Sequence, residues 1–173
     1  TFCLVPLSQD TFIAFGFLID NHLQGCTSAN ISLGLYKNEE LVSVLLIGRN
    51  RYKKGYYEIL RFANKLDTLV MGGFSKLWKQ ALSLIPSNTI VISYADLRYF
   101  TGRSNEAVGF KPSHSSPPSY FYTKDYKVLE NRLKYQKHKL SKILLNFDPL
   151  LTEWENMQLA GYDRIWDCGT AVW

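Results

Sequence analysis

Two adjacent glycines, Gly72 and Gly73, separate a strand-like segment from a strongly amphipathic one, and a buried strand follows. Apolar residues in the stretch 74–85 recur at i, i+3, i+4 and i+7, which predicts a helix. The stretch TIVISYAD at 89–96 is almost continuously apolar, which is typical of a buried strand. A strand, a helix and a second strand in this order form a βαβ crossover with parallel strands. The fold must therefore contain at least one parallel strand pair.

An antiparallel hairpin precedes the crossover. ISLGLY and LVSVLLIG are strand-like, and KNEE between them has hairpin length. The stretch YYEILRFANKL predicts the strand before the glycines, with Tyr57, Ile59, Arg61 and Ala63 alternating onto one face. The order predicts an α/β (α+β) fold with a mixed sheet of about six or seven strands.

A helix is expected near the start of the sequence, capped by Asp10 and extending to about Leu23. The apolar residues that fall on one face of this helix are Phe12, Phe15, Ile19 and Leu23.

Two helices and a strand are predicted near the end of the sequence. Residues 127–145 combine lysines with spaced leucines and predict a basic helix, and Thr152 and Glu155 stand in capping-box register for a second helix. YDRIWDCG predicts a terminal strand. We expect one domain over 1–173, with 127–160 appended as a basic helical segment. Because the sequence begins with Thr1, we also hypothesise a missing upstream module.

The composition limits the partners and the compartment. The net charge of +5 and the pI of about 9.0 favour anionic partners such as nucleic acid or a phosphate-bearing cofactor, although plain solubility explains them equally well. Three cysteines without CxxC spacing indicate reduced thiols and a cytoplasmic protein. No apolar run approaches a membrane span, and no histidine or cysteine cluster indicates a metal site.

The glycine turn has a chemical and a structural interpretation. The first N–H groups of a helix lack internal partners and lie at the positive end of its dipole, so a pyrophosphate can bind there if side chains leave room. The alternative is that Gly72 only provides a left-handed turn. The residues expected to bind the cofactor are Gly72, Gly73, Phe74, Ser75 and Lys76.

The order of elements resembles the GNAT (acetyltransferase-like) fold, in which the loop after the fourth strand cradles the pyrophosphate of acyl-coenzyme A. LVMGGFSKL is similar to that loop, and NEAVGF is similar to the family's segment after the fifth strand. The resemblance implies a GNAT-like acyltransferase fold with C-terminal helices, and acetyl-CoA or another acyl-CoA as cofactor. Asn105 stands where the family's tyrosine often acts as a general acid, and an asparagine cannot supply that proton.

Several segments together, among them NHLQG, LGLYKNEELVS, ILRFANKL, GGFSKL, ISYADLR, SYFY and DCG, resemble a GNAT-like domain of bacteriophage proteins. That domain follows homing-endonuclease modules and is similar to phage Mu Mom-type DNA-modification enzymes. The resemblance implies a transferase that modifies a DNA base amine in the cytoplasm of an infected host, with a nuclease module possible in the same chain. A non-catalytic DNA-binding module and a structural or assembly protein on a GNAT scaffold stay open as alternatives.

Four residues are candidates for catalysis. Arg61 can clamp an anion, or form a salt bridge with Glu58 or Asp96. Ser75 can bind phosphate or the transferred group, or cap its helix. Asp96 can orient or deprotonate an amine, or cap the turn that follows it. His22 can face the substrate, or only favour the end of its helix. The Arg61, Ser75 and Asp96 order resembles the polar set of Mom-like enzymes.

Basic residues fall mainly in the loop RNRYKK and in the stretch 127–145, with tyrosines between them. This pattern suits phosphate contacts combined with base stacking, and a solvated charged surface is the alternative. The residues expected to contact DNA are Arg49, Arg51, Lys53, Lys54, Arg98, Arg103, Lys134 and Lys137.

Overall fold

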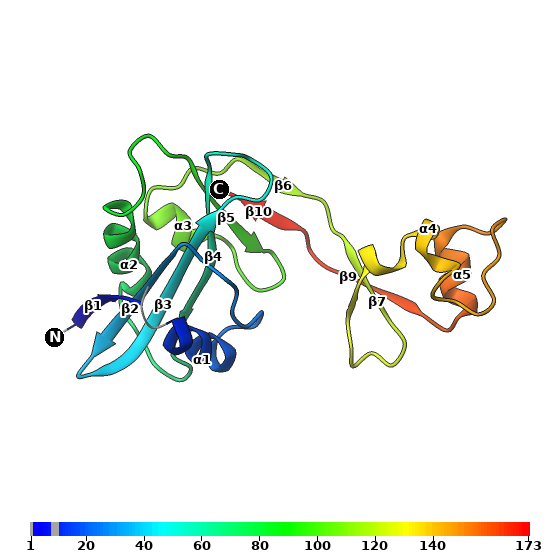
Figure 1. Cartoon of the computed structure of the whole chain (residues 1–173), viewed down its shortest axis with the longest axis horizontal. Coiled ribbons are helices and arrows are strands. Elements are labelled where there is room, and N and C mark those ends of the chain that lie inside the picture. Colours follow the sequence, from blue (N-terminus) through cyan, green and yellow to red (C-terminus); the bar gives the residue numbers. More distant parts are fainter. Residues whose placement is uncertain (1, 8–10) are drawn as a thin grey trace. The chain divides into compact units, whose positions relative to one another are not determined.

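A computed structural model describes residues 2–7 and 11–173 of the chain (Figure 1). Contacts divide the chain into two compact units, and each is described by itself. The first unit comprises the described part of Thr1–Ala95 together with Gly102–His114 and Val172–Trp173, and the second comprises Asp96–Thr101 and Ser115–Ala171. The segment 127–160 therefore lies within the second unit.

The main sheet has seven strands in the order β1-β2-β3-β4-β5-β10-β6. Strands β4 and β5 pair in parallel, whereas β1 to β4 pair antiparallel, which confirms the predicted mixed sheet. The strands are β1 (Phe2–Pro6), β2 (Ile31–Lys37), β3 (Glu40–Arg49), β4 (Tyr57–Asn64), β5 (Val91–Asp96), β6 (His114–Ser116) and β10 (Thr170–Val172). The helices of the first unit are α1 (Thr11–Asn21), α2 (Gly73–Leu82) and α3 (Arg103–Ala107).

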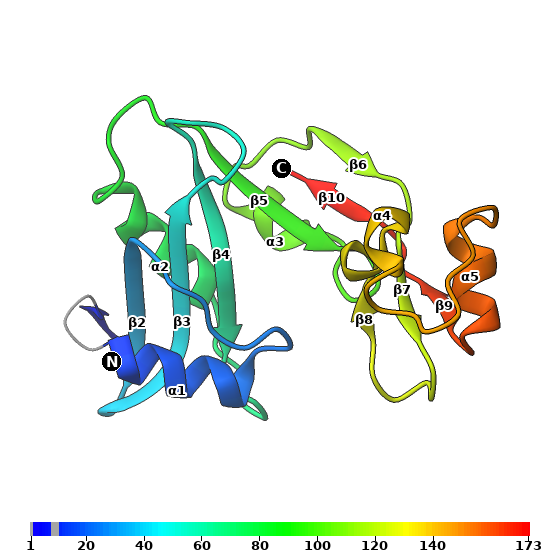
Figure 2. The same cartoon turned by 45° about the vertical axis from the view of Figure 1, so that its right-hand side comes forward.

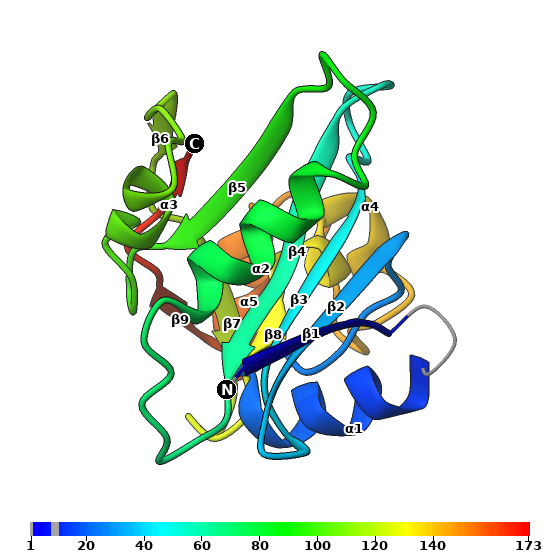
Figure 3. The same ribbon diagram turned by 90° about the vertical axis from the view of Figure 1, so that its left-hand side faces the viewer.

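Helices α1 and α2 cover opposite faces of the sheet in the first unit (Figures 2 and 3). The alternation of β3 supplies both faces: Leu45 and Ile47 pack in the cluster that contains α2, whereas Val44 and Leu46 pack in the cluster that contains α1. Because both faces of β3 are buried, its sequence is almost continuously apolar, like a parallel strand, although both of its neighbours are antiparallel.

The apolar face predicted for the first helix is wrong. Ala14 and Leu18 are buried against the sheet, whereas the four residues assigned to one face are all exposed. Helix α1 is apolar on nearly every side, so its periodicity could not show which side the sheet covers. The predicted cap, Asp10, lies outside the described residues. The exposed residues are Phe12, Phe15, Ile19 and Leu23.

The strict alternation predicted for β4 is also wrong, because the strand contains a bulge. Ile59 pairs with Ile47 and Arg61 pairs with Leu46, so Leu60 is an extra residue in the ladder. After the bulge the faces exchange: Phe62 packs in the α2 cluster, and Ala63 packs in the α1 cluster.

Strands β4 and β5 diverge after a short parallel ladder. Only Tyr57–Ile59 pairs with Val91–Ser93, although both strands continue beyond these residues. The second half of β4 therefore has an edge toward β5 that no strand of the described chain occupies.

The second unit contains a three-stranded sheet in the order β8-β7-β9. Its strands are β7 (Tyr120–Thr123), β8 (Glu130–Asn131) and β9 (Asp163–Trp166), and its helices are η1 (Arg132–Tyr135), α4 (Lys137–Leu140) and α5 (Glu153–Leu159). Helix α5 begins at the predicted capping box, in which Thr152 and Glu155 exchange both hydrogen bonds.

The single basic helix predicted over 127–145 is absent. A two-residue strand, one turn of 3₁₀ helix and one turn of α-helix take its place. The Asn131 side chain accepts a hydrogen bond from the N–H of Leu133, and Gln136 has extended backbone angles that separate the two helical turns. These breaks bury Tyr135 and Leu140 in the same cluster, which a straight helix would place differently.

Candidate functional site

The first turn of α2, which follows β4 in the crossover, presents backbone N–H groups that are free to donate hydrogen bonds. Gly72 adopts a left-handed conformation with φ of 66° and precedes the helix, while the N–H of Gly73 already donates to the Val70 carbonyl over 3.2 Å. Within the described chain, the N–H groups of Phe74 and Ser75 have no backbone acceptor. Two backbone donors of this turn, those of Phe74 and Ser75, are thus available to an anion.

Lys76 holds a positive charge over the same turn. Its ammonium donates to the Met71 carbonyl over 2.9 Å and lies 4.2 Å from the centre of the Phe2 ring. An ammonium group has three donors, so donors remain for an anion. The contacts with Met71 and Phe2 hold the Lys76 ammonium close to the turn.

The two glycines have different structural reasons. Gly72 has the positive φ that favours glycine, whereas Gly73 does not. A Cβ atom on Gly73 would lie 3.0 Å from a Val70 methyl carbon and 3.1 Å from the Asn64 side-chain oxygen. The helix start therefore packs closely on the sheet at Gly73, so a substitution there tests packing before it tests ligand binding.

The open edge of β4 leads to this turn. Before the bulge, the N–H of Tyr57 donates to the Ile90 carbonyl of β5; after the bulge, the N–H of Lys65 donates to the Val42 carbonyl on the β3 side. Backbone groups alternate between the two edges of a strand. The N–H and C=O of Phe62 therefore point away from β3, into the space that β5 leaves open.

Arg61 and His22 lie together on the α1 side of the sheet. The Arg61 guanidinium donates to the carbonyls of Gly25 and Leu60, over 3.0 and 2.6 Å, and makes no ion pair within the described residues. The expected salt bridge with Glu58 or Asp96 is thus replaced by backbone contacts. Partial burial lowers the pKa of the Arg61 guanidinium.

His22 is kept neutral by its surroundings. Partial burial, followed by the charge of Arg61, lowers the pKa of its imidazole. Nδ1 accepts a hydrogen bond from the N–H of Gln24, so the neutral ring carries its proton on Nε2. His22 is therefore suited to donate a hydrogen bond rather than to accept a proton.

Glu58 is a residue that sequence reasoning named only as a salt-bridge partner. It is 8% exposed on β4, close to the point of divergence, and accepts a hydrogen bond from the Asn50 amide over 3.0 Å. A buried carboxylate without a lysine or arginine pair in the described chain can accept a proton. The signal was available in the sequence, where YEILRF places one acidic residue, Glu58, in a mostly apolar strand.

Asp96 and Asn105 are engaged in structural contacts. Asp96 belongs to the second unit, where Arg98 donates to both of its oxygens and lowers the pKa of its carboxyl group. The Asp96 carboxylate also accepts a hydrogen bond from the N–H of Arg98 over 3.0 Å, the kind of contact that the capping alternative describes. Asn105 is buried and accepts a hydrogen bond from the Ser93 hydroxyl over 3.0 Å. Both side chains thus make structural contacts.

The residues predicted to bind nucleic acid are divided between the units. Arg49, Arg51, Lys53, Lys54 and Arg103 belong to the first unit and are exposed. In the second unit, Lys137 is exposed, Lys134 pairs with Glu130, and Arg98 pairs with Asp96. Only the loop of the first unit therefore keeps its predicted cations together on one surface.

No protein-family model matches the sequence, and no curated protein matches it either. Solved structures do match. The ribosomal-protein-S18-alanine N-acetyltransferase of Escherichia coli has a TM-score of 0.54 at 10% identity, over 68% of this chain and 82% of that one. A Bacillus subtilis acetyltransferase in complex with CoA has a TM-score of 0.54 at 9% identity, over 99% and 96%. A Bacillus anthracis acetyltransferase in complex with acetyl coenzyme A has a TM-score of 0.53 at 11% identity, over 67% and 87%.

These matches establish the fold. The chain has a mixed α/β fold like that of the GNAT acetyltransferases, as the sequence predicted. In the described ranges, 2–7 and 11–173, no helix combines the length and apolarity needed to cross a membrane, and no cluster of histidine, cysteine and acidic residues could hold a metal ion.

Proposed function

We propose that this protein is an acyltransferase that uses acyl-CoA. The observation that carries the proposal is the continuity between the open edge of β4 and the first turn of α2. A ligand with an extended, amide-bearing arm and a pyrophosphate can pair its amides with the backbone of Phe62. Its phosphates then reach the free N–H groups of Phe74 and Ser75 and the ammonium of Lys76. Acyl-CoA has this construction and supplies an acyl thioester.

The chain's own residues can assist the transfer. An amine that attacks the thioester carbonyl must lose a proton, and the sulfur that leaves must gain one. We assign the first proton to Glu58, whose buried carboxylate is fixed by Asn50 beside the divergence of β4 and β5. His22, with its proton on Nε2, can donate a hydrogen bond on the α1 side of the sheet. Asn105 contributes no proton, because a carboxamide is not an acid, and its oxygen accepts a hydrogen bond from Ser93. The thiolate that leaves takes its proton from water.

The predicted acceptor is an exocyclic amine of a DNA base. The resemblance to phage Mom-type enzymes suggests this acceptor, and the exposed cations of the loop 49–54 support it, since phosphate contacts position a protein on DNA. A non-catalytic DNA-binding module of a homing-type endonuclease is the second candidate. The structural role of Asn105, at the position of the family's general acid, favours that alternative.

Substitution of Ser75 tests the cofactor site. Ser75 is exposed, and an aspartate in the first helical turn interacts favourably with the helix dipole, so Ser75→Asp should fold. Its carboxylate would occupy the free N–H groups and repel a pyrophosphate. By calorimetry we expect Ser75→Asp to weaken CoA binding by about 30-fold or more, and Ser75→Ala to change it only about threefold. Wild-type protein that fails to bind CoA, or Ser75→Asp that binds it normally, would refute the proposal.

The catalytic assignment needs a separate measurement. Glu58→Gln keeps the shape and the contact with Asn50 but cannot accept a proton. We expect acyl transfer to slow by about 100-fold while the affinity for CoA stays unchanged. Mass spectrometry of nucleosides from DNA treated with protein and acetyl-CoA measures the product. CoA binding without any modified nucleoside would retain the cofactor site and exclude DNA as the acceptor.

A further inference from the structure

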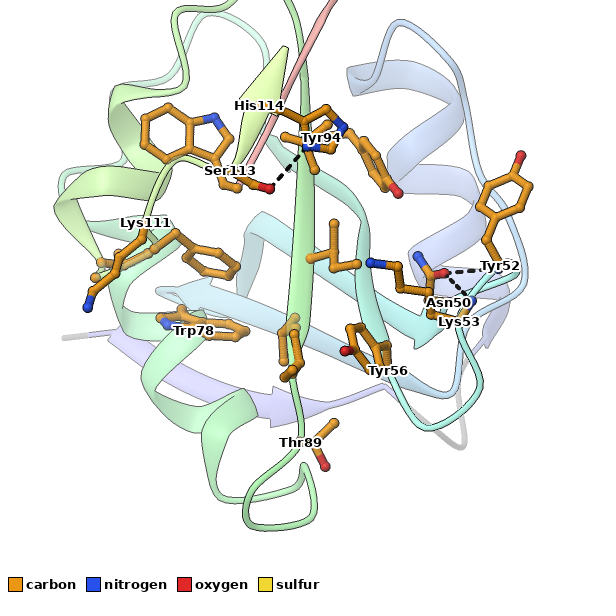
Figure 4. A pocket seen from close by; sticks show the side chains of 18 of the residues that line it. Asn50, Tyr52, Lys53, Tyr56, Trp78, Thr89, Tyr94, Lys111, Ser113 and His114 are labelled. Atoms are coloured by element: carbon orange, nitrogen blue, oxygen red, sulfur yellow. Dashed lines mark hydrogen bonds between the residues drawn. The ribbon is translucent and has the colours of Figure 1, made fainter. Parts of the chain in front are cut away.

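A cavity of about 640 Å³ lies in the first unit, away from the acyl-CoA site. It surrounds the beginning of β5, with Trp78 and Lys111 on one side and Tyr56 and Lys53 on the other (Figure 4). Phe62, Phe74, Ser75 and Lys76, which are proposed to contact acyl-CoA, do not line it. The cavity is therefore distinct from those contacts, although Asn50 lines it and also holds the Glu58 carboxylate.

Aromatic rings form much of the cavity wall. Trp78 of α2, which is 8% exposed, and Phe110, which follows α3, have ring centres 4.9 Å apart, whereas Tyr94 is 42% exposed and lies on the other face of β5. The exposed ring of Tyr94 offers a stacking surface to a planar ligand. The volume falls in the range of small-molecule sites and is large enough for one nucleotide.

The charge of the wall is entirely positive. No aspartate or glutamate lines the cavity, whereas Lys53 and Lys111 do, and both are exposed. Asn50 orders the loop that carries Lys53, because its side-chain oxygen accepts hydrogen bonds from the N–H groups of Tyr52 and Lys53, both over 2.9 Å. The Lys53 ammonium lies 5.4 Å from the centre of the Tyr56 ring. An anionic group at the mouth is therefore favoured next to an aromatic surface.

A free backbone edge faces the same space. The N–H of Tyr57 donates to Ile90, which directs the backbone groups of Val91 away from β4. The equivalent groups of Ser93 pair with Trp173 over 3.1 and 2.9 Å. Val91 lines the cavity, and within the described residues no strand pairs with it on this side. Its N–H and C=O give the wall one donor and one acceptor, as the edge of a nucleobase requires.

From these features we infer that the cavity binds a nucleotide, with the base stacked on the exposed ring of Tyr94, the base edge near Val91, and phosphates drawn to Lys53 on one side of β5 and to Lys111 on the other. The basic loop 49–54 adjoins the cavity and can carry the phosphates of flanking nucleotides, so a single strand of nucleic acid is the source that we expect. The inference deepens the nucleic-acid part of the proposed function and does not depend on acyl transfer.

Binding of oligonucleotides to the full chain tests the base contact. We expect a fluorescent single-stranded oligonucleotide to bind at least about tenfold more tightly than an abasic oligomer of equal charge, and Tyr94→Ala to remove most of that preference. Phe12→Ala is the matched control, because Phe12 is 92% exposed and lies outside the cavity. Equal binding of the abasic oligomer would show a phosphate surface only and would overturn the inference.

The lysines are tested through the salt dependence of binding. Lys111→Gln should reduce the slope of log affinity against log salt by about 0.7, the contribution of one phosphate on a single strand. Lys79→Gln should leave the slope unchanged, since Lys79 is exposed on α2 but does not line the cavity. Equal slopes for the two variants would remove Lys111 from the site.

Four further measurements test the placement of the ligand, its source, its chemical class and the separation of the two sites. Photocrosslinking of a halogenated pyrimidine oligonucleotide should label a peptide containing Tyr94 or Phe110; labelling confined to other peptides would refute the placement. Binding of free nucleoside monophosphates, but not of the oligonucleotide, would support a nucleotide site in the cavity but show that its ligand is a free nucleotide rather than single-stranded nucleic acid. Loss of CoA affinity in Tyr94→Ala would show that the cavity and the acyl-CoA site are not separate. Preferential binding of an extended peptide would show that the ligand of the cavity is not a nucleotide.

Discussion

The two units of this protein have cores of different chemistry. The core of the first unit is mainly aliphatic, with leucine, valine and isoleucine side chains of β2 and β3 packed against helices on two faces. The buried core of the second unit consists of Tyr122, Tyr135, Leu140 and Met157, and Trp154 and Tyr162 pack around it. Arg164 lies 4.2 Å from the ring centres of both Tyr120 and Trp154. The polar groups that the first unit buries are hydrogen-bonded at the margins of its aliphatic clusters, whereas the aromatic core of the second unit must satisfy hydroxyl groups and a cation within the cluster itself.

The largest expected effect is in the aliphatic core. Leu77 is completely buried on α2. Leu77→Ala should lower the free energy of unfolding by about 3 kcal/mol, because the substitution removes buried apolar surface and leaves a cavity. Denaturant titration of the full chain measures the total, and hydrogen exchange of the β3 amides shows whether the first unit is affected. The exposed substitution Leu69→Ala is the control. A loss below about 1 kcal/mol would mean that the α2 contact is looser than the structure shows.

A smaller effect is expected at the cation of the second unit. Arg164 donates to the Tyr122 hydroxyl over 3.2 Å, and that hydroxyl donates to Glu153 over 2.8 Å. Arg164→Met keeps a long apolar stem but loses the three cation–π contacts with Tyr120, Tyr122 and Trp154 and the hydrogen bond, so we expect a loss of about 1 to 2 kcal/mol. Arg164→Lys should restore little, because an ammonium cannot stack between two rings. Full stability in Arg164→Lys would indicate that charge alone is required.

The same difference explains what the sequence could predict. In the first unit, the crossover and the face of α2 follow from aliphatic periodicity, because one apolar stripe meets one sheet. Periodicity gave the wrong buried face for α1, which is apolar on several sides, and for β4, where the bulge at Leu60 exchanges the faces. In the second unit, the capping box of α5 is a local signal and was found. The stretch 127–145 was misassigned because its stability comes from Tyr135 among other rings, a contact that helical periodicity does not encode.

The candidate site was predictable to a similar extent. The glycine turn is visible in the sequence because its residues are contiguous. The contacts of Arg61 and Asp96 were not visible in the sequence. Arg61 donates to the Gly25 carbonyl, 36 residues away, and Asp96 accepts from Arg98, two residues away. Glu58 became a candidate only when its burial and its place beside the diverging strands were known.

The smallest effect, and the one that best distinguishes the two cores, is a loss of stability at alkaline pH. Burial raises the pKa of the Tyr122 and Tyr135 hydroxyls well above their ordinary value of 10.0. Between pH 10 and these higher values, the folded protein retains protons that the unfolded chain has lost, so stability is fully present below about pH 10 and decreases above it. Tyr122 faces Glu153 and Arg164, whereas Tyr135 faces Glu130 and Tyr162. The first unit buries no tyrosine to this degree among its described residues, so this alkaline effect belongs to the second unit.

Tyr135→Phe separates the titration from general alkaline damage. It keeps the ring in the cluster but removes the hydroxyl, so we expect a slightly lower stability near neutral pH and a weaker decrease above pH 10. Thermal unfolding measured as a function of pH gives the effect. Tyrosinate absorbance should show that, while the wild-type protein stays folded, some of its tyrosines ionise at a higher pH than free tyrosine. The exposed Tyr52→Phe is the matched control and should leave the alkaline decrease unchanged. Identical pH profiles for Tyr135→Phe and wild-type protein would show that the buried Tyr135 hydroxyl does not control the alkaline limit of the second core.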